Sequence, residues 1–176
     1  RRNRVEDDPV AICRLKRVAA DLAGDVRACL PKIPGKKNGK RIACIGAGCA
    51  SLTVANDLLP LGYEIVMFEQ YDQTGGLMRS NIPAFRLPAE VLDDEITMIL
   101  EMGVDLRLGH RIDSMAALLA EEFDGVFVGT GAPRGKELDL PGRHDSERIH
   151  IGIDWLESVA FSHTDSIGEN VLIIGV

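Results

Sequence analysis

Two glycines separated by one residue, Gly46 and Gly48, could form a phosphate-binding turn. They lie in the stretch IACIGAGCASL, residues 42–52, where an apolar run ends and a helical pattern begins. Gly46 can adopt a tight turn, Gly48 lets the backbone approach a pyrophosphate, and the N-terminus of the following helix attracts negative charge. Ser51 stands where the dinucleotide fingerprint has a third glycine, whose task is close packing of helix on strand. The stretch predicts a nucleotide-binding turn, and an ordinary strand-turn-helix crossover is the alternative.

An acidic residue and a glycine doublet further along the chain indicate which nucleotide this turn would bind. Glu69 follows Gly46 by 23 residues, a spacing at which an acidic side chain accepts hydrogen bonds from the ribose hydroxyls of an adenosine. Its charge would repel a 2′-phosphate, which disfavours NADP at this position. Gly75 and Gly76 offer bare backbone where a flavin would pass, or form a flexible turn. The residues leave FAD and NAD open, and the doublet favours FAD.

Alternating strand and helix patterns must position these residues. Strands are expected at residues 41–46, 64–69, 104–108 and 125–130. Helices are expected from Leu52 to Leu59, from Ala89 to Met102, after a cap at Ser114, and around Asp154 to Val159. This order predicts an α/β fold in which helices cover a parallel sheet, as in Rossmann-like domains. The connection at residues 70–88 is much longer than the usual ~4 to 6 residues, which is typical of a segment that binds a ligand or moves.

The first part of the chain differs in charge from the rest. Residues 1–37 carry ten Lys or Arg against five Asp or Glu, whereas the remaining residues carry ten against 22. A helix is expected in this part, with Asp8 as its N-cap, Pro9 at its first position and Gly24 at its end. Residues 29–40, CLPKIPGKKNGK, are typical of a linker. We therefore expect a helical segment that precedes the α/β domain.

Composition argues against several classes of function. Hydrophobic residues make up 45% of the chain, but no apolar run approaches the roughly 20 residues of a membrane-spanning helix. The first nine residues lack the apolar core of a signal peptide, so a cytoplasmic location is expected. The basic segment lacks interleaved aromatic residues, which argues against nucleic-acid binding. We expect neither a membrane nor a nucleic acid as partner.

Cysteine and histidine spacing indicates no metal site and no catalytic group. No Cys-x-x-Cys pair occurs, and no histidine has a nucleophile or ligand spacing beside it. Cys44 alternates with apolar residues and is expected to be a buried strand residue. The residues concerned are Cys13, Cys29, Cys44, Cys49, His110, His144, His150 and His163.

Four ordered motifs resemble a known family. They are GAGCAS at residues 46–51, FEQYDQTGGLMRSNIPAFRLPAEVLDDEI at 68–96, MGVDLRLGHRI at 102–112 and GVFVGTGAPRGKELDLPG at 125–142. Together they look like the flavin domain of the glutamate synthase small-subunit family, which includes the flavin portion of dihydropyrimidine dehydrogenase. The resemblance implies that NAD(P)H reduces FAD and that the flavin passes electrons to iron-sulfur clusters and a partner subunit or domain. The flavin would supply the chemistry, so no catalytic residue is named.

The resemblance also implies which residues bind FAD. They fall into groups for the pyrophosphate, the adenosine, the flavin side and further contacts along the cofactor. In that order they are Gly46, Gly48, Ala50 and Ser51; Glu69, Gln70 and Ile112; Gly75, Gly76 and Leu77; and Arg86, Thr130 and Gly131.

The chain departs from the family pattern in the turn and at both ends. Cys49 replaces the usual proline, and the iron-sulfur cysteines that family members carry upstream are absent. We expect a fragment with three parts. Residues 1–37 would be the helical stub of an iron-sulfur-type domain plus linker, 38–170 the FAD-binding domain, and 171–176 the first strand of a truncated NAD(P)H-binding domain. The isolated fragment is expected to be inactive.

Two other functions stay open on the sequence alone. The first is a single-Rossmann NAD-dependent dehydrogenase, although no catalytic pair is evident for it. The second is a non-catalytic interaction module that keeps the Rossmann-like frame and no longer binds a nucleotide, with Cys49 and Ser51 as the altered positions of its turn.

Overall fold

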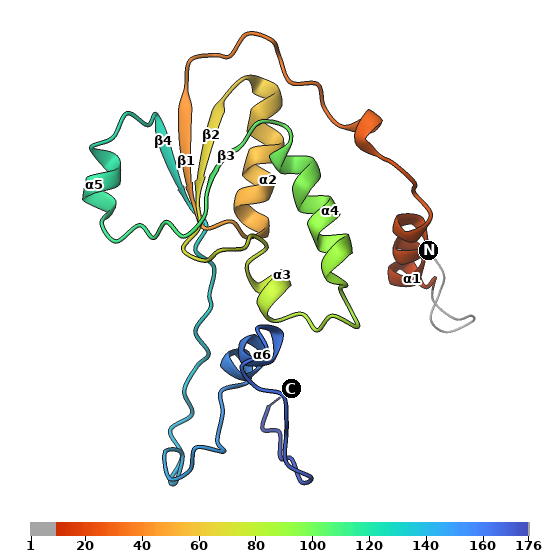
Figure 1. Cartoon of the computed structure of the whole chain (residues 1–176), viewed down its shortest axis with the longest axis vertical. Helices are drawn as coiled ribbons and strands as arrows, with labels where there is room; N and C mark the ends of the chain where they lie inside the picture. Colours follow the sequence, from red (N-terminus) through yellow and green to blue (C-terminus); the bar gives the residue numbers. More distant parts are fainter. Residues whose placement is uncertain (1–9, 176) are drawn as a thin grey trace. The chain divides into compact units, whose positions relative to one another are not determined.

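The structure is a computed structural model that describes residues 10–175 (Figure 1). It divides into two compact units, Arg1–Lys32 and Ile33–Val176. The first unit contains helix α1, Ile12–Asp21, and a short 3-10 helix, η1, at Arg27–Cys29. Among the described residues, the four strands and the remaining helices belong to the second unit.

Helix α1 corresponds to the predicted leading helix with different ends. Its last residue is Asp21 rather than a residue next to Gly24, because Leu22 already leaves the helical conformation with ψ near 7°. Ala11 is the N-cap, and its backbone is not helical, with ψ near 64°. The predicted cap at Asp8 and Pro9 lies outside the described residues. The apolar side chains of the helix and of the residue after it are exposed, namely Ile12, Leu15, Val18 and Leu22.

The second unit is built on a four-stranded sheet. Its strands are β1 (Arg41–Ile45), β2 (Glu64–Phe68), β3 (Asp105–Arg107) and β4 (Gly125–Val128), in the spatial order β3-β2-β1-β4. Every neighbouring pair is parallel, so the predicted α/β fold with a parallel sheet is confirmed. The strands end one or two residues from the predicted bounds, as is usual at element ends.

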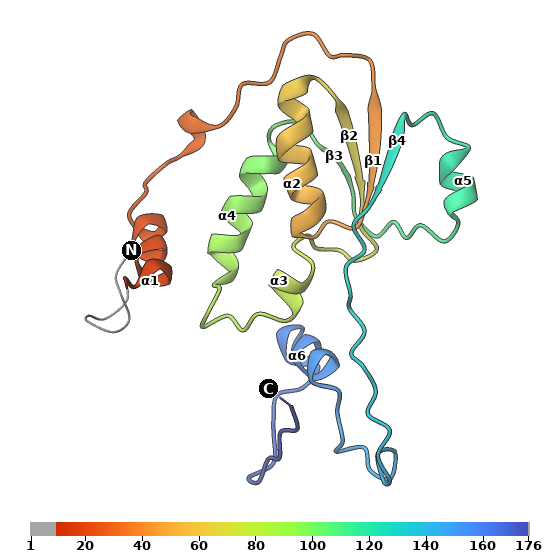
Figure 2. The same ribbon diagram turned by 180° about the vertical axis from the view of Figure 1, so that it is seen from behind.

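Helices cover both faces of this sheet (Figures 1 and 2). On one face lie α2 (Cys49–Leu58), which continues into the 3-10 turn η2 (Leu59–Leu61), and α4 (Ala89–Leu100); on the other lies α5 (Met115–Leu119). Alternate residues of a strand point to opposite faces, so each face has its own core. The α2 and α4 face buries Cys44, Leu52, Ala55, Leu59, Ile65, Met67, Leu92 and Ile96. The α5 face buries Ala43, Ile45, Val66, Phe68 and Leu118.

The chain changes direction across the sheet between β1 and β4. From β1 it proceeds outward through β2 to β3, crosses the opposite face through α5, and enters β4 on the other side of β1. The cap of α5 is at Ser114 as predicted, where the hydroxyl accepts a 3.2 Å hydrogen bond from the amide of Ala117. Open α/β sheets bind ligands at the carboxyl ends of the strands that flank such a point. The loops after β1 and β4 are therefore the place to look for a site.

The remaining helices are α3 (Leu77–Ser80), inside the long connection, and α6 (Gly152–Ala160), at the predicted short helix. The amide side chain of Asn81 joins them by donating to the carbonyl oxygen of Ile153 over 2.7 Å. The strand predicted at residues 171–176 is not formed over the described residues 171–175. A strand requires hydrogen bonds to a neighbour, and this apolar run pairs with no strand of the described chain.

Across residues 10–175, no helix is both long and apolar enough to cross a bilayer. The same residues contain no group of three or more His, Cys, Asp or Glu side chains arranged to hold a metal ion.

Candidate functional site

Two glycine turns meet at the carboxyl end of the sheet. The first joins β1 to α2 through Gly46 and Gly48, and the second lies at Gly75 and Gly76 before α3. The amide of Gly75 donates to the carbonyl oxygen of Ala47 over 2.9 Å. A Cβ on Gly76 would lie 3.1 Å from the Cα of Gly48, and the φ of Gly76, +52°, also favours glycine. The close contact of the two turns therefore depends on bare backbone at Gly76.

The first turn of α2 offers unpaired backbone donors. The helix begins at Cys49, and Gly48 is its N-cap in an extended conformation. Within the described residues, the amides of Gly48, Cys49 and Ala50 donate to no acceptor. The positive end of the helix dipole lies at the same place. These amides are suited to an anionic group such as a pyrophosphate.

Gly46 brings this turn against the loop that follows β4. Its φ is +91°, and a Cβ there would lie only 2.7 Å from the carbonyl oxygen of Gly129. Its amide donates to the carbonyl oxygen of Phe68 over 2.7 Å. The amide of Gly129 donates to the carbonyl oxygen of Ile45 over 2.9 Å. A side chain at Gly46 would force these backbones apart, so the tight turn requires glycine here.

Ser51 lies in α2 against the same loop. The residue is completely buried, and its hydroxyl has no hydrogen-bond partner among the described residues. A Cβ on Gly129 would lie 2.4 Å from the Ser51 Oγ atom. The serine therefore occupies the packing position of the fingerprint's third glycine, while a glycine on the strand side supplies the space. Because Ser51 is completely buried, its side chain is not accessible to a ligand at the phosphate turn.

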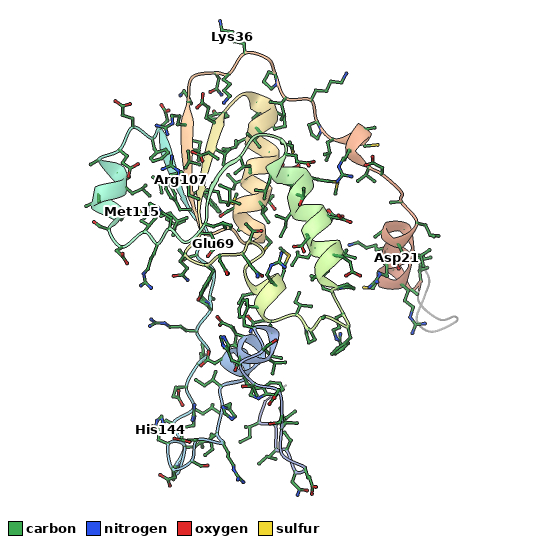
Figure 3. All side chains as sticks on the ribbon, in the orientation of Figure 1. Asp21, Lys36, Glu69, Arg107, Met115 and His144 are labelled. Atoms are coloured by element: carbon green, nitrogen blue, oxygen red, sulfur yellow. The ribbon has the colours of Figure 1, made fainter. Side chains whose placement is uncertain are left out.

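Glu69 lies at the carboxyl end of the sheet, among the residues of the predicted site (Figure 3). It directly follows β2 and is 6% exposed. Its Oε2 atom accepts a 2.8 Å hydrogen bond from the amide of Ala47, and its Oε1 atom accepts a 3.1 Å bond from the amide of Tyr71. A carboxylate has about four acceptor positions. Glu69 thus fixes the phosphate turn to the loop after β2 and keeps acceptor capacity for hydroxyl groups.

Residues at the end of β3 surround Glu69. The amide of Glu69 donates to the carbonyl oxygen of Arg107 over 2.9 Å, and the amide of His110 donates to that of Glu69 over 2.7 Å. The Arg107 guanidinium carbon lies 5.2 Å from the centre of the Phe68 ring, and the His110 ring lies 5.1 Å from it. Arg107 and His110 are therefore next to Glu69 through backbone hydrogen bonds, and their side chains lie against the Phe68 ring. The motif spacing pointed to neither residue.

The other predicted residues lie around this edge at different depths. Ile112 is half-buried and packs against the α5-face core. Thr130 belongs to the same edge, because a Cβ on Gly46 would lie 3.4 Å from its Cα atom. The remaining members are exposed and next to residues already placed, namely Ala50, Gln70, Leu77 and Gly131.

Arg86 is exposed and lies over the ring of its neighbour Phe85, with 5.9 Å from the guanidinium carbon to the ring centre. Its amide donates to the carbonyl oxygen of Pro83, which closes a turn before α4. In the described chain no hydrogen bond, ion pair or ring contact joins Arg86 to the two glycine turns. The structure thus brings most of the predicted residues together and leaves Arg86 outside that group.

The cysteines divide into one buried and three exposed thiols. Cys44 is buried in β1 as predicted, and burial raises the pKa of its thiol from 9.0 to about 11. Cys49 is exposed in the first turn of α2, beside the unpaired amides. Cys13 and Cys29, in the first unit, are also exposed.

A pocket of about 440 Å³ lies beside α6 and includes Glu137, Arg143 and Trp155 in its lining. Within its lining, Arg143 forms an ion pair with Glu137 and donates to the carbonyl oxygen of Ile149 over 3.1 Å. None of the predicted cofactor residues lines it. The four histidines are all exposed, at positions 110, 144, 150 and 163.

Two important positions, Ala47 and Gly129, were not identified from the sequence. Ala47 joins Glu69 and Gly75 through its amide and carbonyl groups, which no side-chain pattern reveals. Gly129 accommodates Ser51 and Gly46. The closely spaced glycines of GTG, residues 129–131, directly after a strand could have indicated a close backbone approach.

Known proteins resemble the chain over nearly its full length, although no protein-family model matches it. It is 36% identical over 172 residues to a Salmonella typhi protein named NAD-dependent dihydropyrimidine dehydrogenase subunit PreT homolog, covering 96% of this chain and 41% of that protein. It is 31% identical over 183 residues to the glutamate synthase [NADPH] small chain of Bacillus subtilis, covering 97% and 37%. It is 33% identical over 175 residues to the NADPH-Fe(3+) oxidoreductase subunit beta of Geobacter sulfurreducens, covering 96% and 26%.

These similarities confirm the predicted resemblance, and the relatives are oxidoreductases by name. The chain spans less than half the length of each of these relatives. Among solved structures, 6-hydroxypseudooxynicotine amine oxidase (HisD) from Pseudomonas geniculata N1 aligns at 25% identity with a TM-score of 0.45, over 65% of this chain and 18% of that one.

Proposed function

We propose that this chain is the FAD-binding part of an oxidoreductase in which NAD(P)H reduces the flavin. The electrons would then pass to iron-sulfur clusters in a partner subunit or domain. The observation that carries the proposal is the contact between Gly48 and Gly76 beside the unpaired amides of α2. A second glycine turn closing on the phosphate turn suits a cofactor that continues past its pyrophosphate.

The residues present fit FAD at three points. The amides of Gly48, Cys49 and Ala50 offer donors for a pyrophosphate. The buried Glu69 carboxylate keeps acceptor positions for ribose hydroxyls. The bare backbone at Gly76 would line the flavin side. When bound, FAD supplies the hydride and single-electron chemistry, while these residues bind and orient it.

The proposal extends to the organisation of the chain. Residues 1–37 would be the helical end of an iron-sulfur-type domain with its linker, and residues 38–170 the FAD-binding domain. The apolar residues 171–174, which are exposed, would begin an NAD(P)H-binding domain. The relatives named above are longer oxidoreductase subunits, which supports this arrangement.

The visible absorption spectrum of the purified protein tests the proposal. The chain is expressed with its natural flanking sequence, and the spectrum is recorded before and after anaerobic addition of NADH or NADPH. We expect flavin bands that bleach on reduction, and FAD in the supernatant after denaturation. A colourless protein that binds NAD would instead be a single-Rossmann dehydrogenase. A protein that binds neither nucleotide, with native circular dichroism, would be an interaction module.

A further inference from the structure

Arg79 joins the second glycine turn to helix α4. It lies in α3, and its side chain is only 16% exposed. Its Nε atom donates a 2.6 Å hydrogen bond to the carbonyl oxygen of Thr74. Its Nη2 atom forms an ion pair with the carboxylate of Asp93 in α4. One guanidinium group therefore contacts the loop backbone and a helix at the same time.

The peptide that Arg79 holds leads directly into the glycine turn. Thr74 precedes Gly75, whose φ of +114° is a conformation that other residues rarely adopt. A Cβ on Gly75 would lie 3.3 Å both from the Cβ of Arg79 and from the side chain of Leu92 in α4. The turn is thus seated between the stem of Arg79 and α4. Gly76 follows at once and contacts Gly48 of the phosphate turn.

We propose that Arg79 is a positioning residue that fixes the turn at Gly75 and Gly76 against Gly48 before the cofactor binds, with Asp93 orienting its guanidinium. The inference rests on the proposed function, because it takes FAD as the ligand of the two turns. A preformed turn avoids the entropy loss of ordering this backbone on binding. Arginine suits the role because its planar fork donates in two fixed directions, whereas a lysine ammonium is a single point charge.

Substitutions at Arg79 distinguish a positioning role from a purely stabilising one by their effect on melting temperature. A residue that only stabilises the fold lowers the melting temperature of the apoprotein and of the FAD complex equally. A positioning residue also reduces the rise in melting temperature that FAD produces, because the apoprotein must order the turn when it binds. The dissociation constant for FAD reports the same difference directly.

The test compares Arg79→Gln, Arg79→Lys, Asp93→Asn and the double variant Arg79→Gln/Asp93→Asn. Apoprotein with its natural flanking sequence is titrated with FAD by flavin fluorescence, and melting is followed with and without saturating FAD. The control is Arg17→Gln, which removes an exposed ion pair with Asp21 in the first unit. Circular dichroism of each apoprotein verifies folding.

We expect Arg79→Gln to raise the Kd for FAD roughly tenfold, the scale of one lost charge-assisted hydrogen bond. Arg79→Lys and Asp93→Asn should raise it less, and Asp93→Asn should add nothing in the Arg79→Gln background. The control should stay within about twofold of wild type. An unchanged Kd in Arg79→Gln overturns the proposal. If that variant does not fold, an unchanged Kd in both Arg79→Lys and Asp93→Asn overturns it. A wild-type protein that binds no FAD overturns the proposed function itself, and the role of Arg79 with it.

Discussion

The hydroxyl of Ser51 lies against the backbone of Gly129, in the space that a Cβ on Gly129 would occupy. The gap from that Cβ position to the Ser51 Oγ atom is 2.4 Å, which no real side chain tolerates. The dinucleotide fingerprint uses its third glycine to let the helix approach the sheet. In this chain the glycine stands on the strand side instead and the helix carries the serine. The helix therefore still packs closely on the sheet, with the glycine on the strand side and the larger residue on the helix.

Gly129→Ala should therefore destabilise the chain, by about 1 to 3 kcal/mol, the usual cost of overpacking. Ser51→Gly in the same chain should restore part of this loss, because it removes the nearest atom. The rest of the loss should remain, because the Phe127 ring also lies only 2.9 Å from the Cβ position. Urea unfolding of wild type, both single variants and the double variant measures the coupling. Strictly additive effects would show that the two residues do not share this space.

Gly48→Ala should impair binding and leave the fold intact. A Cβ on Gly48 would lie 3.9 Å from the Cα of Gly76, an ordinary contact, and its φ of −83° suits any residue. The added methyl group would occupy the surface between the two turns, where the pyrophosphate is proposed to lie. We expect the apoprotein melting temperature to stay within about 1 °C while the Kd for FAD rises at least tenfold, roughly 1.4 kcal/mol.

The matched control for this variant is Gly152→Ala. Gly152 is the first residue of α6, and a Cβ there would meet nothing within 4 Å. Isothermal titration of both apoproteins with FAD makes the comparison. Equal affinities for the two variants would contradict the role given to Gly48.

Glu69→Gln tests the structural task of the carboxylate. Glu69 accepts from the amides of Ala47 and Tyr71, one with each oxygen. A glutamine offers one acceptor oxygen and turns an NH₂ group toward the second amide, which leaves a buried donor unpaired. We expect a loss of about 1 to 3 kcal/mol in the free energy of unfolding of the apoprotein. A change confined to FAD affinity, with unfolding unaltered, would mean that these two bonds contribute little.

Local patterns predicted the β1-α2-β2 unit within one residue at each strand, because buried strands and helices differ in apolar spacing and glycines mark the turn. The contact between Glu69 and Ala47 was not predictable in this way. It joins residues 22 positions apart through a backbone amide. The ribose role of Glu69 stays a prediction, and the structure adds a supporting role that sequence spacing does not reveal.

The prediction was weaker where an element depends on distant partners. Residues 171–175 have the composition of a strand, but a ladder needs a neighbour and none is present in the described chain. The connection at 70–88 was expected to bind a ligand or move. That expectation stays a prediction, and the structure adds α3 inside the connection and an arginine that reaches α4, 14 residues further on. Such side-chain contacts follow from the tertiary arrangement, not from local periodicity.

Cys49 should report occupancy of the proposed site. It is exposed in the first turn of α2, next to Gly48, and Cys13 and Cys29 are exposed in the other unit. We expect FAD to slow alkylation of Cys49 at least several-fold and to leave the other two exposed thiols unchanged. Peptide mass spectrometry after timed reaction with iodoacetamide gives all rates from one sample. Equal slowing of the three thiols, or of none, would argue against FAD at this turn.

The buried thiol of Cys44 predicts how stability depends on alkaline pH. Burial raises its pKa from 9.0 to about 11. Between these values the unfolded chain loses the thiol proton and the folded chain keeps it, so the free energy of unfolding decreases as pH rises. The slope approaches about 1.4 kcal/mol per pH unit, and the contribution is fully present only below pH 9.

Cys44→Ala isolates this contribution, because other groups that titrate in the same range are common to both proteins. At pH 8 the variant should be less stable than wild type, by about 1 kcal/mol or more, through lost packing in β1. By pH 10.5 the wild type should have lost about 2 kcal/mol relative to the variant, which would remove or reverse the difference. Guanidinium unfolding in the presence of a phosphine reductant measures both values. A stability difference that stays constant from pH 8 to 10.5 would show that the folded thiol ionises as readily as the unfolded one.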